Sequence, residues 1–284
     1  KGGTVWMRTR FDPVEVLSII RDKRITDVAL VPTMIRKILA ISETASGPDL
    51  DRLRILTGGE PFGRELSRRL KMLLSDASVV DIYGLTETCS SDFFLVEKDR
   101  EFAGTIGYPG PEVQFRIADD QGCVLPIKHI GELQIRTPFI MNGYLDEPEL
   151  TRSIFIEGYF RTGDLAQQLE DGRVELTGRI KDLIVRGGTK VSPLELDCVL
   201  LEHPGIAAAL TTGIPDEIMG ERIHALIVPR AGASIDETGL RDWVASRVER
   251  FKWPDVYHFA TELPTGRTGK VDRNALRDQV LRKS

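Results

Sequence analysis

Short apolar runs alternate with helical segments along the first 85 residues, and this alternation constrains the fold more than any other feature of the sequence. Runs typical of buried strands occupy residues 27–31, 53–57 and 78–83. The segments between them have helical character, and Asp12-Pro13 and Pro32 mark two helix starts. Because strands buried on both faces must be joined by helices, the sequence predicts a parallel, helix-covered sheet here.

Tight polar turns join the strand-like segments after residue 90, which changes the expected architecture. Residues 112–117 and 131–137 have the pattern of antiparallel strands. Asp/Gly turns occupy residues 119–122 and 170–173. We therefore expect a small antiparallel β subdomain to follow the parallel sheet.

The segment from residue 192 onward predicts a separate, small α+β unit. Ser192 and Glu195 have the spacing of a capping box. Residues 236–251 have the pattern of an amphipathic helix whose buried side includes Phe251. Further strands are expected at residues 206–212, 223–229 and 256–259.

Composition excludes several classes of protein. A chain of 284 residues with 41% hydrophobic and 29% charged residues is typical of soluble globular proteins, and a net charge of −5 argues against a nucleic-acid partner. No apolar run approaches the about 18 residues that a membrane span needs. The three cysteines are far apart and lack metal-binding spacing, so we expect reduced thiols in a cytoplasmic protein.

Two segments that follow predicted strands carry unusual residues. In parallel sheets, ligands bind beyond the carboxyl ends of the strands. Residues 57–61 and 83–88 lie at such ends and combine glycines with hydroxyls and the carboxylates of Glu60 and Glu87. These groups suit a phosphate or a metal ion. The alternative is that Thr86 and Glu87 cap a helix and that Tyr83 belongs to the core.

A glycine-flanked lysine, Lys270, lies in a turn close to the end of the sequence. A nucleotide P-loop does not fit this turn, because Pro264 replaces its first glycine and Val271 replaces its metal-binding hydroxyl. Taken alone, the turn is more typical of a solvated surface lysine than of a catalytic one. Asp164 is a second isolated candidate, since it follows Gly163 in a loop and a carboxylate there can accept from two adjacent hydroxyls.

Taken together and in this order, five motifs resemble those of the adenylate-forming superfamily. That superfamily includes acyl-CoA synthetases, luciferases and the adenylation domains of nonribosomal peptide synthetases, and the resemblance covers essentially the whole chain. The motifs are LTGGEP (56–61), YGLTET (83–88), GYFRTGDL (158–165), GRIKDLIVRGG (178–188) and PTGRTGKVDR (264–273).

The resemblance implies a fold and a reaction. Residues 1–180 should be the C-terminal part of the large α/β domain, with its sheet portion at about 1–104 and a β subdomain at about 105–180. Residues 181–284 should be a mobile α+β C-terminal domain. The implied enzyme is an acid–thiol ligase that uses ATP, Mg²⁺ and coenzyme A. A carboxylic acid attacks the α-phosphate to give an acyl-adenylate and pyrophosphate, and a thiol then displaces AMP.

The resemblance also implies roles for single residues. Lys270, Thr86 and Glu87 should be catalytic, with Glu87 holding Mg²⁺. Gly187 and Gly188 should let the pantetheine of CoA pass close to the backbone. Lys181 should be the hinge between the large and small domains. The implied nucleotide-binding residues are Gly58, Gly59, Glu60, Asp81, Tyr83, Gly84, Thr86, Asp164, Arg179 and Lys270.

Two departures from the family pattern stand out. The Ser/Thr/Gly-rich phosphate loop belongs upstream of Lys1 and is absent from these 284 residues. We therefore expect the chain to be the second half of a synthetase of roughly 500 residues, and to make little or no adenylate alone. The second departure is Lys190, where acyl-CoA synthetases usually carry Asn.

Alternative functions remain at this point. Because no carrier domain follows Ser284, free CoA is favoured over a carrier-protein pantetheine as acceptor. A truncated, non-catalytic module that binds AMP or acyl-adenylate is a further alternative, although Thr86, Glu87, Asp164 and Lys270 argue against it. The residues near the expected acyl pocket are equally compatible with aryl acids and with medium-chain aliphatic acids. The sequence does not specify the oligomeric state.

Overall fold

The structure, a computed structural model, falls into two compact units. Unit 1 comprises Lys1–Glu112 with Phe139–Met141, and unit 2 comprises Val113–Pro138 with Asn142–Ser284. The described residues are 2–42, 53–59, 62, 64–73, 77–89, 91–96, 104–266 and 271–282. The domain boundary expected between residues 180 and 181 stays a prediction.

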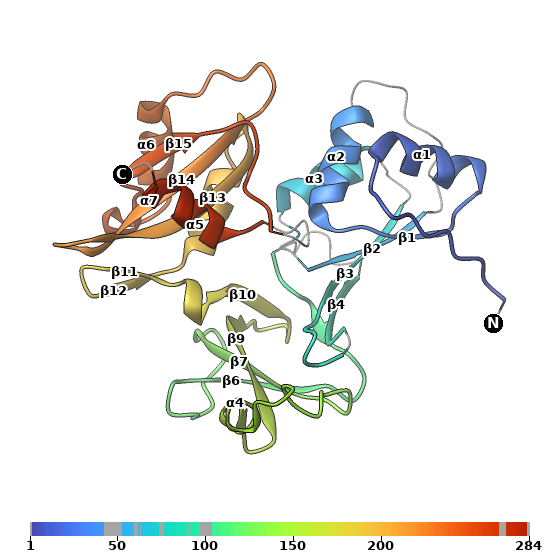
Figure 1. The fold of residues 1–284 in the computed structure, drawn as a ribbon, viewed down its shortest axis with the longest axis horizontal. Coiled ribbons are helices and arrows are strands. Elements are labelled where there is room, and N and C mark those ends of the chain that lie inside the picture. The colour runs from blue at the N-terminus through green and yellow to red at the C-terminus, as the bar shows by residue number, and fades with distance from the viewer. Residues whose placement is uncertain are drawn as a thin grey trace. The chain divides into compact units, whose positions relative to one another are not determined.

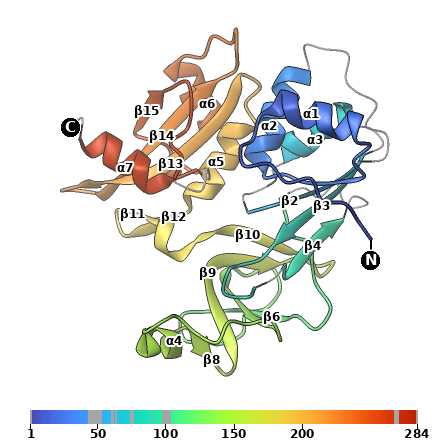
Figure 2. The same ribbon diagram turned by 45° about the vertical axis from the view of Figure 1, so that its right-hand side comes forward.

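Unit 1 is built on a five-stranded sheet with the order β1-β2-β3-β4-β5. The parallel strands are β1 (Asp27–Ala29), β2 (Arg54–Gly58) and β3 (Ser78–Tyr83), and the antiparallel ones are β4 (Phe93–Val96) and β5 (Tyr108–Pro109). The helices α1 (Pro13–Asp22), α2 (Pro32–Ser42) and α3 (Arg64–Leu73) gather on one side of this sheet (Figures 1 and 2). The α/β prediction is confirmed.

Apolar side chains from the three helices and the parallel strands form the core of unit 1. Its fully buried members include Ile35 and Leu39 of α2, Ile55 of β2 and Leu70 of α3. The first helix begins as expected, because the Asp12 carboxylate accepts from the Glu15 backbone N–H at 2.8 Å.

The first part of unit 2 is an antiparallel sheet with the order β10-β9-β7-β6, and β8 pairs with β9. Its strands are β6 (Gln114–Ala118), β7 (Gly131–Arg136), β8 (Phe155–Ile156), β9 (Tyr159–Gln168) and β10 (Val174–Arg179), and α4 (Pro148–Ser153) precedes β8. The expected turn at residues 170–173 joins β9 to β10. The prediction of a small antiparallel subdomain is confirmed.

The second part of unit 2 contains a sheet with the order β12-β11-β14-β13, to which β15 adds as a parallel partner of β14. Its elements are the 3-10 turn η2 (Ile180–Asp182), β11 (Ile184–Arg186), β12 (Thr189–Val191), α5 (Pro193–Leu201), β13 (Ile206–Asp216), β14 (Gly220–Pro229), α6 (Glu237–Ala245), η3 (Arg250–Lys252), β15 (Val256–Phe259) and α7 (Arg273–Leu281).

Helices cover both faces of this second sheet. Ala209 of β13 packs in one cluster with residues of α5 and α6, whereas the next residue, Leu210, packs in another with Leu276 and Val280 of α7. Successive side chains of a strand point to opposite faces. The double covering therefore explains why β13 is buried without interruption from residue 209 to 214.

Two local expectations for this part are wrong. Ser192 does not cap α5 with its side chain, because its hydroxyl donates to the Thr177 carbonyl, and Glu195 instead pairs with Lys252 at 2.7 Å. The helix expected over residues 236–251 ends at Ala245. The chain leaves the helix where the Trp253 indole donates to the Val248 carbonyl at 2.9 Å, and Phe251 is 44% exposed rather than buried.

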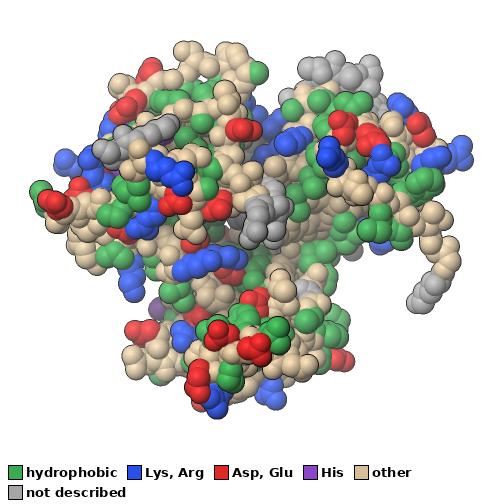
Figure 3. Space-filling model, viewed as in Figure 1, with side chains coloured by type: hydrophobic (Ala, Val, Ile, Leu, Met, Phe, Trp, Pro, Cys, Tyr) green, Lys and Arg blue, Asp and Glu red, His purple; other side chains and the backbone are tan. Residues whose placement is uncertain are grey.

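Two further observations concern the charged side chains on the surface and the length of the helices. Lys and Arg side chains are interspersed with Asp and Glu over the face seen in Figure 3. Among the helices of the described residues, none has the length and apolar character that crossing a membrane requires.

Candidate functional site

The carboxyl ends of β2 and β3 are neighbours in the sheet of unit 1. These strands are parallel, and Gly58 at the end of β2 pairs with Ile82, one residue before the end of β3. The segments that follow therefore leave the sheet at the same edge, as expected for a ligand site in a parallel sheet. The structure thus brings together Gly58 and Gly59 with Tyr83 and Gly84.

The two glycines after β2 have backbone roles of their own. A Cβ atom on Gly58 would stand 2.3 Å from the Ile82 carbonyl oxygen, and Gly59 has a φ of +81°. Only glycine satisfies both conditions without strain. Close approach of a ligand is therefore not needed to explain this pair, and Glu60, the third residue of the predicted segment, lies outside the described residues.

The segment after β3 is a turn rather than a helix. Tyr83 is half-buried and packs edge-on against Phe93, with ring centroids 5.9 Å apart. The chain then turns at residues 86–89, where the Cys89 N–H donates to the Thr86 carbonyl at 3.1 Å. The alternative in which Thr86 and Glu87 cap a helix is therefore wrong. Thr86 is exposed at this turn and Glu87 is half-buried.

Asp81 lies on β3, two residues before Tyr83, in a setting that favours its neutral form. Burial raises the pKa of its carboxyl to about 7. Its partner in the parallel ladder is Thr57, whose buried hydroxyl makes no hydrogen bond within the described part of the chain. A neutral carboxyl can donate a hydrogen bond, so this edge offers a donor that switches off near neutral pH.

Asp164 lies in an irregular part of β9 in unit 2. Leu165 pairs with Glu132 of β7 and Arg161 pairs with Gln134, so the three residues Thr162–Asp164 oppose Leu133 alone. We call this segment the β9 bulge. Bulges of this kind redirect side chains next to functional sites.

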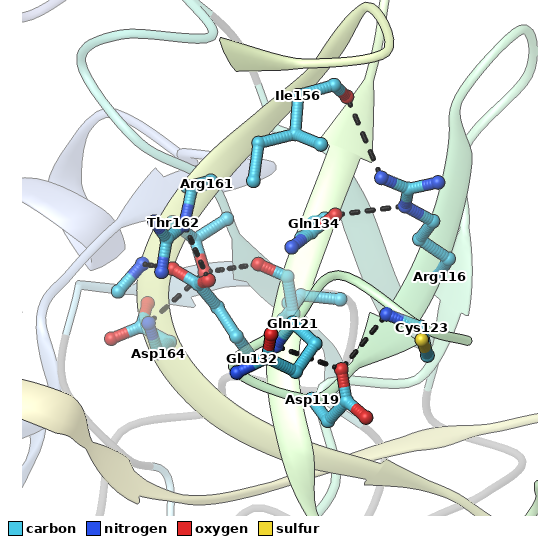
Figure 4. Close-up of polar contacts among 12 residues, drawn as sticks. Arg116, Asp119, Gln121, Cys123, Glu132, Gln134, Ile156, Arg161, Thr162 and Asp164 are labelled. Atoms are coloured by element: carbon cyan, nitrogen blue, oxygen red, sulfur yellow. Dashed lines mark hydrogen bonds and ion pairs between the residues drawn. The ribbon is translucent and has the colours of Figure 1, made fainter. Parts of the chain in front are cut away.

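Polar contacts hold the β9 bulge in place (Figure 4). One carboxylate oxygen of Glu132 accepts from the Gly163 N–H at 3.1 Å, and the other accepts from Arg161 Nε at 2.7 Å. The Thr162 hydroxyl donates to the Leu133 carbonyl at 2.6 Å and accepts from the Asp164 N–H at 3.0 Å. Gly163 has a φ of +71°, which favours glycine there.

Asp164 and Arg179, two of the predicted nucleotide-binding residues, form an ion pair. Arg179 Nε lies 2.7 Å from Asp164 Oδ1, and the two residues are cross-strand partners of β9 and β10. The Asp164 side chain is only 3% exposed, whereas that of Arg179 is 50% exposed. A buried carboxylate with a half-exposed cation beside it is suited to exchanging that partner for ligand hydroxyls.

The remaining predicted residues of unit 2 lie on its second sheet or next to it. Lys181 is an exposed residue of η2, between β10 and β11. Gly187 and Gly188 form the two-residue turn between β11 and β12, with φ values of +55° and +81°. Such turns prefer glycine at both positions, so the hairpin alone accounts for this pair. Lys190 is exposed on β12.

Lys270 lies outside the described residues. On either side of residues 267–270, Thr265 and Val271 form an antiparallel bridge, and the Asp272 N–H donates to the Pro264 carbonyl at 2.9 Å. The Asp272 carboxylate then caps α7 by accepting from the Asn274 and Ala275 N–H groups.

The predicted protein ligand of Mg²⁺ is a single carboxylate, that of the half-buried Glu87. No group of three His, Cys, Asp or Glu side chains suited to a metal ion occurs among the described residues. Mg²⁺ bound together with a nucleotide takes one or two protein carboxylates and completes its shell with phosphates and water. A single carboxylate at the turn after β3 is therefore a sufficient protein contribution.

Sequence reasoning missed Glu132, Arg161 and Thr162, which support Asp164. Glu132 occupies a strand position next to Leu133, where an acidic residue normally indicates a solvent-facing side chain, yet it is 6% exposed. The GYFRTGDL motif does contain Arg161 and Thr162, but their partners on β7 are evident only in the folded chain.

Two family models match the chain. The model described as AMP-binding enzyme matches residues 1–145. The model described as AMP-binding enzyme C-terminal domain matches residues 195–270.

Individual relatives agree with these matches. A feruloyl-CoA synthase from Amycolatopsis sp is 35% identical over 98% of this chain and 56% of its own length. An amide bond synthetase from Marinactinospora thermotolerans has a TM-score of 0.91 at 31% identity, over 98% of this chain and 57% of its own. The o-succinylbenzoate coenzyme A synthetase from Bacillus subtilis, solved with ATP and a magnesium ion, has a TM-score of 0.81 at 29% identity, over 95% and 55%. The chain thus spans about half the length of the relatives it matches.

Proposed function

The chain belongs to the family of AMP-binding enzymes, and from this premise we propose that it is part of an acid–thiol ligase. The proposed enzyme activates a carboxylic acid with ATP to an acyl-adenylate and transfers the acyl group to coenzyme A. AMP and pyrophosphate leave. The placement of the two predicted nucleotide segments at one edge of the unit 1 sheet is the observation that carries this proposal.

In the first step the residues of unit 1 bind and activate the nucleotide. Tyr83 stacks on the adenine, and the exposed Thr86 hydroxyl contacts the α-phosphate. Glu87 would hold Mg²⁺, and the bound ion would supply positive charge against the negative charge that builds on the phosphates. Asp81, together with the backbone of Gly58 and Gly59, lines the adenine side.

Residues of unit 2 have proposed roles of their own. Asp164 accepts from the ribose hydroxyls, and Arg179 moves from Asp164 to the ribose or the phosphate. Lys270 bridges the acid and the α-phosphate, where a compact cation on a long side chain stabilises the developing charge. Lys181 is the proposed hinge between domains 1–180 and 181–284, and the exposed Gly187–Gly188 turn is the proposed passage for pantetheine.

The two half-reactions provide the test. We would measure pyrophosphate release from ATP and an acid, and separately thioester formation from CoA and a chemically prepared acyl-adenylate, using the complete gene product and a panel of aryl and medium-chain acids. Lys270→Ala should slow pyrophosphate release by about 100-fold and leave the second half-reaction nearly unchanged. Lys128→Ala removes an exposed lysine that pairs with Glu170 and serves as the control. Equal losses in the two half-reactions would contradict the assignment of Lys270.

A carrier-protein pantetheine presents the same reactive thiol as CoA, so it is the alternative acceptor. A fatty acid–acyl-carrier-protein ligase from Streptomyces coeruleorubidus is 34% identical to the chain. Supplying a phosphopantetheinylated carrier protein in place of CoA distinguishes the two acceptors. AMP binding without turnover would favour a non-catalytic module.

The three free cysteines are far apart in sequence, and on this ground we propose a cytoplasmic location.

A further inference from the structure

Glu132 has no role in the proposed reaction, yet its position connects it to the ribose-binding carboxylate. The side chain lies on β7, opposite the β9 bulge, and is 6% exposed. Burying a carboxylate costs free energy unless it is paired and hydrogen-bonded. Glu132 meets this condition through Arg161 and the Gly163 N–H, both of which belong to the strand that carries Asp164.

The β9 bulge needs such a partner. Between Leu165 and Arg161, β9 has three residues where β7 has one, so the backbone groups of the bulge lose their regular ladder partners. The Gly163 N–H is satisfied by the Glu132 carboxylate, and the Asp164 N–H is satisfied by the Thr162 hydroxyl. Without Glu132, Gly163 would keep its φ of +71° with no acceptor for its N–H among these contacts.

We propose that Glu132 is a positioning residue, which fixes the β9 bulge and thereby sets the direction in which Asp164 presents its carboxylate to a ribose. This inference rests on the proposed function, because it assumes that Asp164 binds the ribose. Glu132 acts through the Gly163 backbone and Arg161 and does not touch the nucleotide. Arg179, on the opposite neighbour β10, holds Asp164 from the other side.

Discrimination between ATP and 2′-deoxyATP, or between ATP and 3′-deoxyATP, is the readout that separates positioning from general stability. We would measure kcat and KM for each nucleotide with the complete gene product. Glu132→Ala should raise the KM for ATP by about tenfold. One of the two deoxynucleotides lacks the hydroxyl that Asp164 binds, and its KM should stay nearly constant. Glu132→Gln keeps an acceptor for Gly163, so it should restore part of the discrimination.

Gln134→Ala is the matched control. Gln134 lies two residues along the same strand, is 1% exposed and accepts from Arg116 Nε at 2.8 Å, but makes no contact with the β9 bulge in the described network. It should lower stability without changing nucleotide discrimination. Should Glu132→Ala fold poorly, Glu132→Gln and Arg161→Met, which removes the second partner of the carboxylate, carry the test.

The outcomes separate the two proposals. If Asp164→Ala abolishes discrimination and the Glu132 variants retain that of the wild type, Glu132 does not position Asp164 and the proposed function stands. If the wild-type protein and Asp164→Ala discriminate equally, the ribose assignment itself is wrong. If Gln134→Ala loses discrimination as strongly as Glu132→Ala, the effect is one of general stability and the inference is overturned.

Discussion

Gly58 faces Ile82 so closely that a Cβ atom at position 58 would stand 2.3 Å from the Ile82 carbonyl oxygen. Gly58 and Ile82 are partners in the parallel ladder of β2 and β3, and the predicted nucleotide segments begin at the ends of these strands. Gly58→Ala should therefore force the strand ends apart and lower the free energy of unfolding by about 1–3 kcal/mol.

Thermal unfolding of the purified protein measures the effect of Gly58→Ala. Gly3→Ala is the matched control, because a Cβ atom at Gly3 meets nothing within 4 Å. The control should change stability by less than about 0.5 kcal/mol. Equal transition temperatures for the two variants would show that the contact is not structurally important.

Asp81 should make the stability of unit 1 depend on pH. Burial raises the pKa of its carboxyl from 3.8 to about 7. The folded state therefore binds a proton that the unfolded state has released, so the contribution is fully present below pH 3.8 and is lost as the pH rises through 7. Asp81→Asn should abolish this loss, which we expect to be on the order of 4 kcal/mol over the whole range.

Urea unfolding at pH 5.5 and at pH 8.5 tests Asp81 most directly. The wild-type protein should lose more stability between these values than Asp81→Asn does. Asp119→Asn provides the control, since the Asp119 carboxylate lies in an exposed turn and accepts from two backbone N–H groups. Identical pH dependence of wild type and Asp81→Asn would mean that Asp81 is ionised throughout.

His224 and His258 should respond to acid as a pair. Their Nδ1 and Nε2 atoms lie 2.9 Å apart, so one ring must donate and the other must accept. Burial, followed by His258 and Arg222, lowers the pKa of His224 to about 4, and Asp255 opposes the shift. Since the pKa in the unfolded state is near 6.5, this contribution to stability is present above pH 6.5 and is lost as the pH falls through 4.

Proton NMR of the imidazole Cε1–H resonances would follow the two rings separately. The His224 signal should stay at its neutral position down to about pH 5, and His258→Gln should raise the pKa of His224 by removing a neighbouring charge. A His224 midpoint near 6.5 would contradict the expected effect of burial.

Arg273 and Asp197 should contribute far more to stability than the neighbouring surface pair. The guanidinium of Arg273, at the start of α7, pairs with Asp197 of α5 and donates to the Thr211 carbonyl, while Asp197 accepts from the Thr211 N–H. Because Asp197 is 5% exposed, Arg273→Gln should leave a buried, uncompensated carboxylate and cost about 3–5 kcal/mol.

One turn further along α7, Arg277 pairs with Glu221 at 3.4 Å and is 40% exposed. Arg277→Gln should therefore cost less than about 1 kcal/mol. Chemical unfolding of the two single variants, with Asp197→Asn and the double variant completing a cycle, would measure the coupling. Comparable costs for Arg273→Gln and Arg277→Gln would contradict the effect attributed to burial.

The parallel part of the fold was predictable because each of its elements has a strong local signal. The apolar run 78–83 and the Asp12-Pro13 helix start describe β3 and α1 closely. The signal at Ser192 and Glu195 failed because both side chains take partners remote in sequence, Thr177 and Lys252. Local spacing cannot show that a side chain will be used elsewhere.

The site residues stay a prediction, but the structure does bring two of them together. Asp164 and Arg179, 15 positions apart and in separate motifs, meet as cross-strand partners. The motifs could not indicate Glu132, because its function depends on the register of β7 against β9. Register is a property of the folded sheet, and alternation in one strand does not reveal an extra pair of residues in the next.

The β9 bulge also determines which changes in chain length the subdomain can accept. Side chains alternate along a strand with a period of two, so deleting one residue from Thr162–Asp164 would turn part of β9 inside out. Deleting two, Gly163 and Asp164, would give an uninterrupted ladder with β7 and keep the other side chains on their present faces. Packing against β7 therefore does not require the two additional residues. Comparing the stability of a variant that lacks these two residues with that of the intact chain would measure the free energy that the bulge costs.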